Sequence, residues 1–150
     1  MPSLDNMMLR QIIMDHYENP RNHELVEDDS YKKVNMDSET CIDNIDIQAK
    51  IENGVIEDIR FDGEACAICT SSTSIMTELL IGKTIDEARV IIENYMNMIF
   101  EKDYDPEMLE EAIAFYNTHK QANRIKCATL GWKGITQLID ESEKEDTHGK

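Results

Sequence analysis

Two stretches of alternating apolar and polar residues, joined by a tight turn, constrain the fold of this chain most strongly. Residues 45–51 read IDIQAKI and residues 55–61 read VIEDIRF, with ENG between them. Successive side chains of a strand point to opposite faces, so each stretch gives a strand with one apolar face. Gly54 supplies the positive φ that such a turn needs. The pattern predicts an antiparallel hairpin with one buried face, on which Val55 and Phe61 lie.

Helical periodicity surrounds this hairpin, and a weaker strand is predicted just before it, in YKKVNM at 31–36. The predicted helices lie between Ser3 and Pro20, between Gly63 and Gly82, from Thr84 to Phe100, from Asp105 to His119, and from near Cys127 onward. The order of helix, strands and helices is typical of an α+β fold, a small antiparallel three-stranded sheet with helices packed on one face. We expect a single domain over residues 1–150, with a frayed acidic tail at about 141–150.

The charge of the chain limits its partners. Its 31 acidic and 15 basic residues give a formal net charge of −16. Such a chain repels phosphate backbones and anionic lipids, so we expect neither nucleic-acid nor membrane binding. No apolar run approaches the roughly 20 residues that span a bilayer, and the N-terminal sequence lacks a signal-peptide profile. We therefore expect a cytoplasmic protein whose thiols stay reduced, which favours metal or redox chemistry over disulfides.

Three of the four cysteines fall at predicted element ends. Cys41 precedes the hairpin, Cys66 stands where its second strand gives way to a helix, and Cys127 begins the last helix. Asp43 follows Cys41 by two residues, so in an extended chain both side chains share one side. Three thiolates and one carboxylate suit a tetrahedral divalent metal, most simply zinc. The sequence therefore predicts a metal site of Cys41, Asp43, Cys66 and Cys127.

Cys69 leaves the fourth ligand open. It follows Cys66 by three residues, and a C-x-x-C pair commonly chelates one metal, so Cys69 competes with Asp43 for that place. Packing on a helix explains Cys69 at least as well, and a redox pair with Cys66 is a third interpretation. Two alternative functions follow from these residues: a structural zinc module that presents a protein–protein surface, and a C-x-x-C thiol redox switch.

Two nearby residues have less specific interpretations. Lys126 directly precedes Cys127 and either favours its thiolate or is an ordinary exposed lysine. His16 lies near the apolar stripe of the first helix, where a hydrogen-bonded core or capping histidine is more common than a metal ligand.

Several motifs, in order along the chain, resemble those of a known family. They are IIMDHYENPRN, the CID of residues 41–43, IEDIRFDGEAC, SSTSIMTELLIGKT and RIKCATLGWKGI. Together they resemble the U-type iron–sulfur cluster assembly proteins (the IscU/NifU N-terminal-like family) from about Leu9 to Ile139. The long segment before Cys127, and Lys126 where the IscU branch has histidine, resemble the SufU branch.

The resemblance implies a SufE/NifU-like fold and a zinc-compatible site of the same four residues. It also implies that the site accepts sulfur from a cysteine desulfurase of the SufS kind. We expect Cys41 to be the acceptor that forms a persulfide, because its flanking loop should be the most mobile of the ligand segments. A transient iron–sulfur cluster and contacts with other assembly or acceptor proteins are further implications. Arg124 matches an arginine that the SufU branch carries ahead of its last cysteine. Such a chain is a sulfur acceptor or scaffold rather than a stand-alone enzyme.

The chain departs from the family pattern at three places. Ile42 stands where the family usually has glycine, which puts the mobility of Cys41 in question, and Cys69 stands where serine is usual. The Leu-Pro-Pro-Val-Lys motif by which the IscU branch engages its chaperone is replaced by HKQANRIKC. We therefore expect no dependence on that chaperone.

Overall fold

The computed structural model describes residues 6–38 and 42–148, and the side chains of these residues up to 144. Cys41, a predicted ligand and acceptor, therefore lies outside the described residues. The elements in chain order are α1 (Asn6–Glu18), β1 (Lys32–Asp37), β2 (Asn44–Glu52), β3 (Val55–Glu64), α2 (Ala67–Leu80), α3 (Ile85–Ile99), the 3₁₀-helices η1 (Pro106–Met108), η2 (Glu110–Phe115) and η3 (Thr118–Lys120), and α4 (Ala122–His148).

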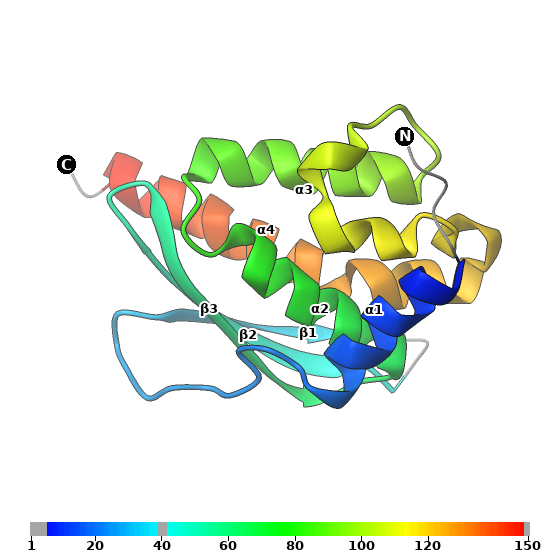
Figure 1. Cartoon of the computed structure of the whole chain (residues 1–150). Coiled ribbons are helices and arrows are strands. Elements are labelled where there is room, and N and C mark those ends of the chain that lie inside the picture. The colour runs from blue at the N-terminus through cyan, green and yellow to red at the C-terminus, as the bar shows by residue number, and fades with distance from the viewer. Residues whose placement is uncertain (1–5, 39–41, 149–150) are drawn as a thin grey trace.

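The three strands form one antiparallel sheet in the order β1-β2-β3, and the helices cover one of its faces (Figure 1). The predicted α+β fold is therefore confirmed. The hairpin differs in one detail, because a register shift at Lys50 and Ile51 places Ile56 in the core and leaves Val55 half-buried. A bulge of this kind adds a residue to one strand and interrupts strict alternation.

Helix α2 lies at the centre of the helical layer, between α1 and α4, and α4 packs on β1 and β2. The buried apolar residues of all these elements form one hydrophobic core. Helix α3 begins where predicted, and Thr84 and Glu87 form a capping box there: the Glu87 N–H donates to Thr84 Oγ1 at 3.1 Å, and Glu87 Oε1 accepts from the Thr84 N–H at 2.9 Å.

The prediction of one helix over residues 105–119 is wrong, because the structure has three short 3₁₀-helices there. Glu110 adopts φ 46°, which interrupts a helix. Four consecutive residues, 112–115, are buried, whereas an α-helix on a surface buries only one stripe. Bonds from residue i to i+3, such as Tyr116 N–H to Ile113 O at 3.0 Å, allow this packing.

The last helix also begins earlier than predicted, at Ala122 rather than near Cys127. Its C-terminal part continues to His148, and Arg89 on α3 pairs with Asp140 and Glu143 on its surface. The fraying predicted for residues 141–150 and the single-domain assignment stay predictions. No helix in the described part of the chain is long and apolar enough to cross a membrane.

A buried polar network fastens α2 to α3 and α4. Trp132 stacks on Tyr95 with ring centroids 3.8 Å apart, and its Nε1–H donates to Ser72 Oγ at 3.0 Å. The Ser72 hydroxyl donates to the Ala128 carbonyl at 2.6 Å, and the Tyr95 hydroxyl donates to the same oxygen at 2.7 Å. Burial raises the pKa of Tyr95 far above its usual range, so the phenol stays a donor.

Ser72→Ala is expected to destabilise the fold by about 1–3 kcal/mol, because it leaves the buried indole N–H of Trp132 without an acceptor. The matched control is Ser71→Ala on the same helix. Among the described residues, the Ser71 hydroxyl donates only to carbonyls of its own helix, Ala67 O at 2.7 Å and Ile68 O at 3.3 Å. Its removal therefore leaves none of these residues with an unpaired donor. Denaturant unfolding, followed by Trp132 fluorescence, measures the free energy of unfolding of both variants. Equal losses in the two variants would contradict the role of Ser72.

Candidate metal centre

Asp43 lies at the entrance to β2, where the chain comes back from β1. Its carbonyl accepts the Ser38 N–H at 2.9 Å, which fixes the backbone there. Its side chain is fully buried, and its Oδ1 accepts the backbone N–H of Cys66 at 2.7 Å. This bond ties the start of β2 to the start of α2. A buried carboxylate is costly unless it carries a proton or meets a positive charge, so Asp43 is suited to face a cation.

Gly63 allows this junction to form. Its φ is +138°, and a Cβ on it would lie 2.3 Å from Asn44 O and 2.8 Å from the Ile45 Cα. β2 and β3 can therefore approach so closely only with glycine here. Two residues after β3 ends, Cys66 begins the next helix. The close approach places Cys66 beside Asp43.

Cys66 is the N-cap residue of α2. Its Sγ accepts the N–H of Cys69 at 3.4 Å and lies 3.8 Å from Asp43 Oδ2. Unpaired N–H groups and the dipole at a helix N-terminus favour a negative charge on such a sulfur. Cys66 thus lies where the sequence predicts it, between the end of a strand and the start of a helix.

Cys127 approaches from the other side, on α4. It lies in the second turn of that helix and not at its start as predicted, because the helix begins at Ala122. Its side chain is buried, and its thiol lies 3.8 Å from the Asn123 carbonyl, one turn earlier. Asp43, Cys66 and Cys127 each offer one ligand atom, and these three atoms all lie within 4.8 Å of one another.

The donor set fits a divalent metal. Zinc bonds of about 2.1–2.3 Å place tetrahedral ligand atoms about 3.4–3.8 Å apart, so a small inward rotation of these side chains is enough to bind the ion. Cysteine sulfurs and carboxylate oxygens are both ligands that zinc accepts. The place of the fourth ligand, predicted for Cys41, lies outside the described residues and stays a prediction.

Cys69 occupies a different environment. Its side chain is fully buried in the hydrophobic core, and it is not among the ligand atoms that converge with those of Asp43, Cys66 and Cys127 in the described part of the chain. Its burial favours the packing interpretation. The alternative in which Cys69 supplies the fourth ligand stays a prediction.

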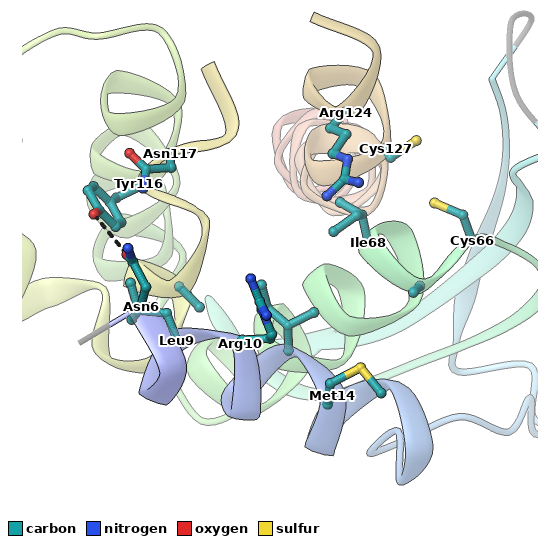
Figure 2. A pocket seen from close by; sticks show the side chains of 13 residues that line it. Asn6, Leu9, Arg10, Met14, Cys66, Ile68, Tyr116, Asn117, Arg124 and Cys127 are labelled. Atoms are coloured by element: carbon teal, nitrogen blue, oxygen red, sulfur yellow. Dashed lines mark hydrogen bonds between the residues drawn. The ribbon is translucent and has the colours of Figure 1, made fainter. Parts of the chain in front are cut away.

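An open cleft of about 650 Å³ leads to the two thiols. Apolar residues of α1 and the first turn of α2 line it, together with Cys66, Cys127 and two arginines, Arg10 and Arg124 (Figure 2). Neither guanidinium forms an ion pair with a residue that the structure describes. In a chain of net charge −16, this cleft therefore presents positive charge beside reactive sulfur. Lys126 is exposed and does not line the cleft.

The sequence reasoning missed Arg10. It is one of many exposed residues of α1, and no local pattern sets it apart from its neighbours. Only the packing of α1 against α2 brings it to the cleft. His16 agrees with its core interpretation: it is fully buried, with Nδ1 2.8 Å from Ser74 Oγ and Nε2 3.1 Å from Glu111 Oε1.

Comparisons with known proteins show what the chain is similar to. The profile of the NifU-like N-terminal domain matches residues 8–146. The zinc-dependent sulfurtransferase SufU of Bacillus subtilis is 37% identical over 137 residues, which cover 91% of this chain and 92% of that protein. The iron–sulfur cluster assembly scaffold protein IscU of Streptococcus pyogenes is 32% identical over 138 residues, 91% of this chain and 86% of the relative.

A solved structure has the same architecture. It is the crystal structure of a candidate iron–sulfur cluster assembly scaffold protein for the SUF system of Fervidobacterium islandicum AW-1. It superposes with a TM-score of 0.80 at 29% sequence identity, over 91% of this chain and 99% of the other.

Proposed function

The chain belongs to the family of NifU-like N-terminal domains, and from this premise we propose that it accepts sulfur from a cysteine desulfurase at a zinc-binding cysteine site. The accepted sulfur then serves iron–sulfur cluster assembly. The observation that carries this proposal is the convergence of Asp43, Cys66 and Cys127, with ligand atoms within 4.8 Å of one another, beside an open cleft. The names of the SufU and IscU relatives support the same activity.

Cys41 is the proposed acceptor and the fourth ligand. It precedes Asp43 by two residues, so the chain keeps their Cα atoms within about 7 Å of each other. Zinc at this site would hold the ligand thiols as nucleophilic thiolates at neutral pH. Asp43 is an oxygen ligand among sulfurs and is therefore the weakest one. Its bond from the Cys66 N–H keeps the carboxylate oriented when the site opens.

The proposed transfer is a thiol exchange. The Cys41 thiolate attacks the terminal sulfur of a persulfide on the desulfurase and forms a new S–S bond. The old S–S bond breaks, and the cysteine of the desulfurase leaves as a thiolate. Cys66 and Cys127 stay in place on α2 and α4 during this step. Iron that later enters the site would be cargo for a nascent cluster.

The surface around the site supports a protein partner. Met7 and Met14 on α1 and Ile42 beside Asp43 are large apolar side chains with exposed fractions of 66%, 43% and 69%. Exposed methionines adapt to a partner surface, and the cleft arginines add positive charge next to them. We propose that the desulfurase docks on this rim. We place the reaction in the cytoplasm, where thiols stay reduced.

A desulfurase assay tests the acceptor. Cys41→Ala is expected to reduce the stimulated rate of alanine formation from cysteine to that of the desulfurase alone, because the proposed acceptor thiol is gone and Cys66 and Cys127 are engaged as metal ligands. Cys69→Ala is the matched control and should keep the stimulation, since Cys69 lies in the core. The assay contains a thiol reductant, so that every variant turns over. If Cys69→Ala loses the stimulation and Cys41→Ala keeps it, the assignment is wrong.

A further inference from the structure

Cys66 and Cys69 are arranged as a dithiol pair at the start of α2. Cys66 caps the helix and Cys69 lies one turn into it, with the Cys69 N–H directed at Cys66 Sγ at 3.4 Å. Residues three apart on a helix have Cβ atoms about 5–6 Å apart. A modest rotation at the N-cap, which is outside the regular helix, brings them to the roughly 3.5–4.5 Å of a disulfide. The pair can therefore close without unfolding α2.

The two thiols differ in their access to solvent. Cys66 is half-buried and lines the cleft (Figure 2). Cys69 is fully buried and is not among the residues that line it. In thiol exchange the attacking and leaving sulfurs lie on opposite sides of the sulfur under attack. A second sulfur carried on Cys66 would extend into the open cleft, with Cys69 behind it on the core side. This arrangement suits displacement of the outer sulfur.

We propose that this pair releases sulfide from a persulfide held on Cys66. This proposal depends on the proposed function in one respect only, which is that persulfide sulfur is delivered to this site. The Cys69 sulfur bonds to Cys66 Sγ, and the bond between Cys66 Sγ and the outer sulfur breaks. The outer sulfur leaves with the electron pair as HS⁻, and the thiol proton of Cys69 goes to solvent or to this leaving group. The outer sulfur is reduced to sulfide, and the two cysteines are oxidised to a disulfide.

Charge around the cleft favours this outcome. The helix N-terminus stabilises negative charge near Cys66, and Arg10 and Arg124 offer positive charge to the departing sulfide. Because Cys69 is buried, oxidants in solution have little access to it. It can instead be oxidised by the persulfide on Cys66. A metal ligated by Cys66 would block the pair, because the same sulfur cannot hold the ion and a persulfide. The chain would thus supply two electrons for one sulfide before an external reductant restores the thiols.

The experiment uses the full chain, stripped of metal with a chelator and fully reduced, and one equivalent of glutathione persulfide as the probe, with no other thiol added. The Cys66 thiolate attacks the outer sulfur of the probe, and glutathione leaves as a thiolate. Cys66 and Cys69 lie on one tryptic peptide, between Arg60 and Lys83. We expect about one sulfide per chain from this pair, and a peptide that is about 2 Da lighter and resists alkylation. Cys69→Ala should instead accumulate a persulfide on Cys66 and release several-fold less sulfide. Ser71→Ala, on the next turn of α2, should behave as the unchanged chain.

Cys69→Ser provides a second thiol-free variant in case alanine disturbs the core, and circular dichroism checks both. Sulfide release by either folded variant at the rate of the unchanged chain would overturn the proposal. So would an unchanged chain that keeps its persulfide without a Cys66–Cys69 disulfide. The desulfurase assay separates the two ideas: loss of stimulation by Cys41→Ala concerns the acceptor, whereas release from glutathione persulfide concerns the dithiol alone.

Discussion

Cys127→Ala is expected to lower the zinc content of the purified chain from about one ion to almost none. The variant removes one of the two sulfurs that approach Asp43 from different elements. Of the four proposed ligands it leaves three, one of which is the weakly bound oxygen of Asp43, so zinc should no longer be held tightly. Metal analysis after dialysis, with competition against a chromophoric chelator, measures both content and affinity. The matched control is Cys69→Ala, which removes a thiol from the core and should leave the zinc content unchanged.

Zinc retained by Cys127→Ala with undiminished affinity would place the site elsewhere.

The same preparations separate the proposed function from a structural zinc module. A structural module unfolds when a chelator removes its metal. We expect the unchanged chain to keep its far-ultraviolet circular dichroism and a cooperative thermal transition after chelation, because its core is formed by apolar residues of all the main elements. Loss of the metal removes only the stabilisation that ligand binding adds.

Gly63→Ala is expected to destabilise the protein by about 3 kcal/mol or more, through backbone strain and a steric clash. The new Cβ would meet two backbone atoms of the neighbouring strand, Asn44 O at 2.3 Å and the Ile45 Cα at 2.8 Å. Because backbone atoms cannot rotate away as a side chain can, β2 and β3 must separate. Asp43 and Cys66 flank this contact, so zinc affinity should fall together with stability.

Gly54→Ala isolates the conformational part of this effect. Gly54 also has a positive φ, +74°, but a Cβ there meets nothing within 4 Å. It should cost only about 1–2 kcal/mol, the usual penalty for a left-handed residue, and leave zinc binding intact. Chemical unfolding and zinc titration of both variants provide the comparison. Equal losses of stability, or a Gly63→Ala variant with full zinc affinity, would contradict the role of Gly63 at the junction.

Local signals predicted most of the fold correctly. The alternation in residues 45–51 and the turn at Gly54 specify the hairpin, and Thr84 with Glu87 specifies the start of α3. These signals depend on neighbours within about four residues, so they can be read without tertiary structure. The resemblance to the U-type family, drawn from ordered motifs, is confirmed by the family profile over residues 8–146.

Other features depend on packing and were missed or misplaced. The segment 105–119 has the composition of a helix, but burial of four consecutive residues and the positive φ of Glu110 break it into 3₁₀ turns. Ser72 is one of several serines and threonines in α2 and has no local signal that sets it apart, yet it accepts the indole N–H of Trp132 from another helix. The two residues of this hydrogen bond are 60 positions apart, so no local sequence pattern predicts it.

The sequence by itself determined which chemical groups are available: thiols at or near element ends, a carboxylate beside one of them, and elements with defined capping signals. Tertiary structure alone decided which of these groups share one space. Cys66 and Cys127 lie far apart along the chain, and their sulfurs meet Asp43 only because β3 leads into α2 at Gly63 while α4 crosses beside them. Short-range preferences set each element, whereas convergence needs the burial of a common core, which no short stretch encodes.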